Sequence, residues 1–187
     1  MPLYHILKND HFHRDLKPEN ILIKKITKKD KTYNIYKICD YGMIKDTNAV
    51  DNEYSYWYSK VGTSPYSSDS VLNQKYKKIC DIFSIGIILY ELYYKFDEFP
   101  YEKSNQLEIR KNVLENIKKG LKIKNEKEED INEFNNLKDL IEKCTKDENN
   151  RINWNDYFNH PFFNYEIETK LKINEEDLNN EIYRIRK

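Results

Sequence analysis

A stretch in the middle of the chain, Ile82 to Leu92, is apolar on nearly every side when it is read as a helix. A surface helix keeps polar residues along one face, so a helix that is apolar all round has to be buried. It is too short to cross a bilayer, which takes about 20 residues. The chain must therefore wrap other helices around it. Two patterns suit that purpose: a helix over 107–119 that ends at Gly120, and the i, i+3, i+4, i+7 series Leu137, Leu140, Ile141 and Cys144.

The 187 residues are enough for one domain with a core of this kind. The 32 basic and 32 acidic residues cancel, which argues against nucleic acid or an anionic membrane as a partner. Cys39, Cys80 and Cys144 are scattered, as is typical of a reducing compartment and of a protein without a disulfide framework or zinc site. The first residues lack the basic and apolar regions of a signal peptide, so we expect a cytoplasmic protein.

The most informative polar stretch is 13–20, which reads His-Arg-Asp-Leu-Lys-Pro-Glu-Asn. Pro18 fixes its own φ and pushes Lys17 toward an extended backbone. Asp15 and Lys17 are two residues apart, so in an extended stretch their side chains share a face. Phosphoryl transfer needs a carboxylate for the attacking hydroxyl, a cation for the γ-phosphate and an oxygen ligand for Mg²⁺. Asp15, Lys17 and Asn20 supply these three groups in order.

This stretch resembles the catalytic loop of protein kinases. The β-branched run Ile21–Ile23 and the alternating run Tyr33–Cys39 predict a hairpin with a long charged tip over 24–32. The hairpin leads into Asp40-Tyr41-Gly42, which is similar to the kinase magnesium motif with Tyr in place of Phe. The resemblance implies ATP and Mg²⁺ as cofactors, with Asn20 and Asp40 as the metal ligands.

The resemblance also implies a binding site for the nucleotide and its supports. Leu22 and Cys39 are expected beside the nucleotide, and Ile88 and Leu92 are expected to stack with Leu22 toward the adenine. Asp81, at the start of the buried helix, is expected to bond the backbone of the catalytic loop.

The hydroxyl-rich stretch 43–66 is similar to a kinase activation segment, and the protein substrate is expected to lie against it. Thr63 together with Lys17 is the combination found in serine/threonine kinases. Arg14 is the residue that in such kinases receives a phosphorylated side chain, because a phosphate can order a loop against arginine. A surface loop whose hydroxyls are never modified explains the composition equally well.

The chain departs from the family pattern at Ser68-Asp69-Ser70, where Ala-Pro-Glu is expected. The glutamate of that motif pairs with a buried arginine, which is Arg151 here. A buried guanidinium without a partner would be costly. We therefore predict that Asp69 pairs with Arg151 in place of the missing glutamate.

The resemblance predicts a mainly α fold: a protein-kinase-like large lobe over 1–163, with a short β-hairpin at the active site, followed by a charged tail over 164–187. The ending Arg151-Ile152 with Trp154–Phe163 is similar to Unc-51-like kinases. No glycine-rich phosphate loop and no small-lobe lysine precede the catalytic loop, so we expect the small lobe to be absent or supplied by a partner. Three interpretations remain open: the large lobe of an active kinase, a non-catalytic scaffold, and a decayed fragment. We expect the chain alone to be inactive.

Overall fold

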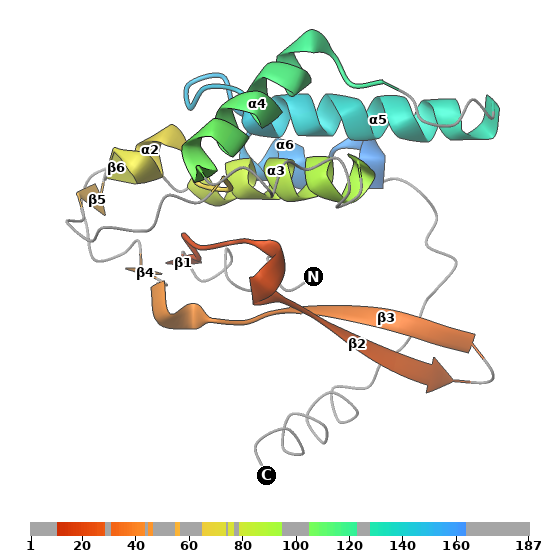
Figure 1. Cartoon of the computed structure of the whole chain (residues 1–187). Coiled ribbons are helices and arrows are strands. Elements are labelled where there is room, and N and C mark those ends of the chain that lie inside the picture. Colours follow the sequence, from red (N-terminus) through yellow and green to blue (C-terminus); the bar gives the residue numbers. More distant parts are fainter. Residues whose placement is uncertain are drawn as a thin grey trace.

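The computed structural model describes a mainly helical protein with one antiparallel hairpin (Figure 1). This agrees with the fold class that the sequence predicts. The described residues are 11–28, 31–43, 45–46, 55–56, 65–73, 75–76, 79–94, 105–122 and 128–163. The residue Thr63 and the tail 164–187 lie outside them. No helix in the described part is long and apolar enough to cross a membrane.

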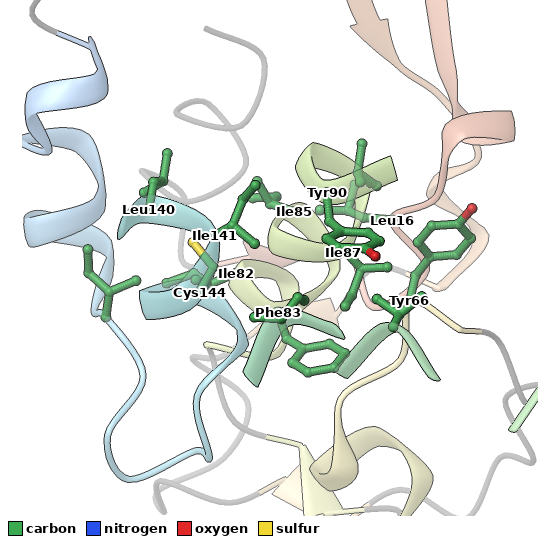
Figure 2. Packing of buried hydrophobic residues seen from close by; sticks show 14 of the residues in the cluster. Leu16, Tyr66, Ile82, Phe83, Ile85, Ile87, Tyr90, Leu140, Ile141 and Cys144 are labelled. Carbon is green, nitrogen blue, oxygen red and sulfur yellow. The ribbon is translucent and has the colours of Figure 1, made fainter. Parts of the chain in front are cut away.

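The buried helix is α3 (Cys80–Tyr94), and it forms the centre of the core. Every residue from Asp81 to Ile88 is buried, as its all-round apolarity predicts. It packs against α5 (Glu128–Thr145), whose Leu140, Ile141 and Cys144 are fully buried. Figure 2 shows these three side chains in one cluster with residues of α3.

Gly86 lets α3 and α5 approach closely, because a Cβ built on it would lie 2.7 Å from Cys144 Cβ. Two further helices complete the helical body: α4 (Gln106–Lys119) and the short α6 (Trp154–Phe158). Gly120, with φ of 90°, ends α4 at the residue that the sequence indicates. Helix α6 ends before Asn159, and the 3₁₀ turn η4 (Pro161–Phe163) follows.

The hairpin consists of β2 (Ile21–Lys28) and β3 (Lys31–Ile38), and Figure 1 shows it projecting away from the helices. Both strands continue through most of the stretch that was predicted to be a charged loop. The pairing runs from Ile21 opposite Ile38 to Lys28 opposite Lys31. Cross-strand pairs such as Thr27 and Thr32, with hydroxyls 3.3 Å apart, support the ladder there.

Short elements hold the remaining described segments in place. Strand β1 (His11–Phe12) pairs with β4 (Lys45–Asp46), and β5 (Ser55–Tyr56) pairs with β6 (Lys75–Tyr76). The 3₁₀ turns η1 (Pro18–Asn20) and η2 (Tyr41–Met43) flank the hairpin. The four-residue helix α2 (Asp69–Leu72) starts after Ser68, whose hydroxyl accepts a hydrogen bond from the Val71 amide.

Candidate active site

The loop between β1 and the hairpin is fixed to α3 by one buried carboxylate. Asp81 Oδ2 accepts a hydrogen bond from the His13 amide at 2.6 Å, and Oδ1 accepts one from the Arg14 amide at 2.8 Å. Burial raises the pKa of Asp81, and the two amide donors oppose that shift because they stabilise the charged form. This is the contact expected for Asp81, and it sets the position of the loop relative to the core.

Two side chains of the loop, those of Lys17 and Asn20, meet at the Asp15 carboxylate. The Lys17 ammonium lies 2.8 Å from Asp15 Oδ2, and Asn20 Nδ2 donates to the same oxygen at 3.1 Å. Asn20 Nδ2 also donates to the Asp15 carbonyl at 2.8 Å, which ties the last residue of the turn η1 back to Asp15. The hydrogen bond to Asp15 raises the pKa of Lys17, against the effect of partial burial, and the carboxylates of Glu19 and Asp40 add to it. The sequence-predicted trio is therefore one contiguous polar group.

The residue before Asp40, Cys39, joins the end of the hairpin to the catalytic loop. The Cys39 amide donates to the Asn20 carbonyl at 2.9 Å, and one nitrogen of the buried His13 ring lies 3.0 Å from the Cys39 carbonyl. Asp40 follows with a positive φ of 61°, a conformation that Asp tolerates better than most residues. Its side chain is exposed. The hydroxyl of Tyr41, the residue that replaces Phe, donates to the Ile38 carbonyl at 2.8 Å.

Arg14 connects the loop to the chain beyond the hairpin. Its Nε donates to the Met43 carbonyl at 2.6 Å, and its guanidinium carbon lies 6.0 Å from the centre of the Phe12 ring. The hydroxyls that could carry a phosphate facing Arg14 fall in segments whose side chains lie outside the description. The regulatory role of Arg14 therefore stays a prediction.

The side chains expected at the adenine differ in exposure. Leu22 is 53% exposed and Leu92 is 59% exposed, whereas Ile88 is buried in the core. Cys39 is half-buried and is a free thiol, as are the buried Cys80 and Cys144. The exposure of Leu92 departs from the prediction of a helix buried along its whole length.

Tyr66 is held against α3 at two points. The Ser84 hydroxyl donates to the Tyr66 carbonyl at 2.8 Å, and the Tyr66 hydroxyl donates to Glu91 Oε2 at 2.6 Å. Burial raises the pKa of Glu91. Sequence analysis missed this pair, although Glu91, the one acid in the otherwise apolar stretch Ile82–Leu92, was the signal that could have revealed it.

The predicted pair of Asp69 and Arg151 is wrong. Asp69 Oδ1 accepts a hydrogen bond at 2.7 Å from Arg110, while Arg151 donates to the backbone carbonyls of Lys146 and Ile79. The reason is helical geometry: neighbouring residues of a helix point about 100° apart. At the start of α2, Ser70 therefore faces inward and is buried, whereas Asp69 faces solvent. Burial lowers the pKa of Arg151, and nearby negative groups, the Glu148 carboxylate first among them, oppose that shift.

The donor set at the end of the hairpin fits a magnesium ion that is bound together with a nucleotide. Since Asn20 Nδ2 is occupied by Asp15, its Oδ1 is the atom that the amide can offer to a cation. The Asp40 carboxylate supplies a second hard oxygen, and Mg²⁺ commonly takes one or two carboxylates together with phosphates and waters. The described residues hold no cluster of three or more His, Cys, Asp or Glu that could bind a metal unaided.

The chain belongs to the protein kinase domain family, which matches residues 2–163. A probable serine/threonine-protein kinase of Dictyostelium discoideum is 33% identical over 180 residues, which are 94% of this chain and 10% of that protein. Calcium-dependent protein kinase 3 of Plasmodium berghei is 32% identical over 169 residues, covering 86% of this chain and 28% of the relative. A putative serine/threonine-protein kinase of Acanthamoeba polyphaga mimivirus is 32% identical over 192 residues, covering 95% of this chain and 40% of the relative. The chain thus spans between 10% and 40% of the length of these relatives.

Proposed function

We propose that the chain is the large lobe of a serine/threonine protein kinase, which transfers the γ-phosphate of ATP to hydroxyls of a protein substrate. The observation that carries the proposal is the arrangement at Asp15. Lys17 and Asn20 both hold Oδ2, so Oδ1 is the oxygen left to accept a hydrogen bond from an incoming hydroxyl. A carboxylate oriented in this way is the group that phosphoryl transfer to an alcohol requires.

Each polar side chain of the loop has a distinct role in this proposal. Asp15 orients the substrate hydroxyl and accepts its proton. Lys17 places its charge between Asp15 and the transferred phosphate. Asn20 and Asp40 hold Mg²⁺, which when bound with ATP neutralises charge on the phosphates. Asp81 and Arg151 act as structural supports, because Asp81 fixes the catalytic loop and Arg151 joins the Ile79 carbonyl before α3 to the Lys146 carbonyl after α5.

The finer assignments rest on the resemblance together with exposure. Lys17 and Thr63 support serine or threonine as the acceptor, and Arg14 supports control by a phosphate in the activation segment. Leu22 and Cys39 are assigned to the nucleotide on the resemblance, and the 53% exposure of Leu22 supports this for Leu22. The likeness to Unc-51-like kinases remains a prediction.

The domain assignment is likewise a proposal: residues 1–163 form the lobe and 164–187 form a tail. The exposed side chains of Leu22 and Leu92 support the presence of a further part of the kinase, in the same protein or in a partner, that covers them. The half-site formed by Asp15, Lys17, Asn20 and Asp40 does not exclude water on its own, and electrostatic catalysis depends on a dry, pre-organised site. We propose a cytoplasmic protein, since the three free cysteines suit a reducing compartment.

Transfer of phosphate to a serine peptide in Mg-ATP tests this function. The protein is assayed as these 187 residues alone and joined to the small lobe of a related kinase. Activity should require the small lobe, and Asp40→Ala should abolish it because the carboxylate ligand of Mg²⁺ is lost. Substantial turnover in the joined protein carrying Asp40→Ala would refute the metal assignment, and equal activity of the two preparations would refute the role of the small lobe.

A further inference from the structure

One arginine of α4 connects two parts of the chain that are far apart in sequence. Arg110 Nε donates to the Ser67 carbonyl at 3.0 Å, and its Nη2 lies 2.7 Å from Asp69 Oδ1. The Arg110 side chain is 12% exposed, so it lies between α4 and the segment 65–73 and does not extend into solvent. The two bonds come from different nitrogens of one planar group, which fixes direction as well as distance.

The same guanidinium stacks on the core helix. The Arg110 guanidinium carbon lies 5.1 Å from the centre of the buried Phe83 ring, and that of Arg151 lies 5.2 Å from it. Arginine over an aromatic ring gains cation–π attraction, more so when it is shielded from water. Arg151 donates to Lys146 and Ile79 and makes no hydrogen bond to the described residues 65–73. Within the described structure, Arg110 is therefore the charged side chain that attaches this segment to both α3 and α4.

We propose that Arg110 is a positioning residue that fixes the turn at Ser67–Asp69 and thereby sets the affinity for the protein substrate. The turn directly follows Tyr66, which α3 holds through Ser84 and Glu91. Thr63, which is assigned to substrate recognition on the resemblance alone, precedes the turn by four residues in the sequence. The effect on substrate affinity rests on the kinase function proposed above, whereas the anchoring of the turn does not.

The two bonds of Arg110 differ in environment. Asp69 is 71% exposed at its side chain, and ion pairs in water contribute little. The Ser67 carbonyl belongs to a buried residue, so its bond and the contact with Phe83 are the stronger attachments. Asp69→Asn should therefore have little effect, Arg110→Ala a large one, and Arg110→Lys an intermediate one because lysine cannot make both bonds while stacked on the ring.

Hydrogen exchange of the full protein tests the anchoring without any activity. The amides of Leu72 and Asn73 donate to the Ser68 and Asp69 carbonyls, so they report whether the turn is closed. Arg110→Ala should speed their exchange about tenfold, the effect of losing roughly one hydrogen bond to a charged group, while amides of α5 stay protected. Lys111→Ala is the matched control, because Lys111 is an exposed neighbour on α4 with a long 3.9 Å pair to Glu115. Unchanged exchange at the turn, or equal acceleration throughout the protein, would overturn the proposal.

Kinetics of the joined kinase test the consequence for the substrate. Arg110→Ala should raise KM for a serine peptide about tenfold and leave KM for ATP within about twofold, and Arg110→Lys should recover part of the loss. Equal changes in both KM values would contradict a role in substrate positioning. If the unsubstituted joined protein transfers no phosphate, the proposed kinase function fails, and hydrogen exchange still decides whether Arg110 anchors the turn.

Discussion

Replacing Asp81 by Asn should loosen the catalytic loop and destabilise the whole protein. The carboxylate is buried, with 1% exposure, and its two oxygens accept separate amide hydrogen bonds of 2.6 and 2.8 Å. Asn keeps one oxygen, so one amide retains its acceptor. The other amide faces an NH₂ group, which cannot accept a hydrogen bond.

The magnitude follows from these contacts. One lost hydrogen bond to a charged group contributes roughly 1.5–3 kcal/mol, and a buried amide without an acceptor costs about 1–3 kcal/mol, two figures that overlap in part. Removing the buried charge offsets part of this loss of stability, because a neutral amide costs less to bury than the Asp81 carboxylate. We expect a decrease of about 2–4 kcal/mol in the free energy of unfolding, a large fraction of the roughly 5–15 kcal/mol typical of domains.

Urea unfolding followed by circular dichroism measures this difference, with an unchanged m-value as the check that the transition stays two-state. Glu115→Gln, which removes an exposed charge from α4, is the control and should change stability by less than about 0.5 kcal/mol. A loss below about 1 kcal/mol for Asp81→Asn would refute the reasoning. It would mean that the two amide bonds do not carry the attachment of the loop to α3.

Three further outcomes are expected. Gly86→Ala should destabilise the protein by about 1–3 kcal/mol, because the new Cβ would lie 2.7 Å from Cys144 Cβ; an unchanged urea midpoint would contradict this close approach of α3 and α5. An electrophile carried by an ATP-site ligand should label the half-buried Cys39 before the buried Cys80 and Cys144, and peptide mapping that finds equal labelling would argue against a nucleotide beside Cys39. Burial raises the pKa of Glu91 above 4.5, so the folded state holds a proton that the unfolded state releases, and stability relative to Glu91→Gln should fall as pH rises from 4 to 7. Urea unfolding of both proteins across that pH range measures this, and a constant difference in their free energies of unfolding would argue against a raised pKa for Glu91.

The parts of the fold that the sequence predicts correctly are those with strong local patterns. The all-round apolarity of Ile82–Leu92 locates the buried helix, and the spacing of Leu137 to Cys144 locates its main partner. Gly120 marks the end of α4 correctly because a positive φ favours glycine there. These features depend on residues within a few turns of one another, so local reasoning can reach them.

The errors come from contacts that local patterns do not encode. The lysine-rich stretch of the hairpin was predicted to be a loop, although cross-strand pairing between Thr27 and Thr32 favours strands. The partner of Asp69 is Arg110, which is 41 residues away, and no motif connects the two. Asp69 lies on the solvent side of α2 because of where that helix starts. A start one residue earlier or later would change which side chain faces inward.

The role of Asp15 is the central claim, and substitution of this residue tests it most directly. Transfer of labelled γ-phosphate from ATP to a serine peptide is measured in the protein joined to a small lobe, comparing Asp15→Asn with Glu19→Gln. Glu19 lies in the same turn but is exposed, so its variant controls for the loss of one negative charge. We predict that Asp15→Asn lowers kcat at least about 100-fold, as expected for a lost acid–base group, with KM for ATP nearly unchanged, and that Glu19→Gln stays within about threefold of the unsubstituted protein. A kcat for Asp15→Asn within about threefold of the unsubstituted value would contradict the account.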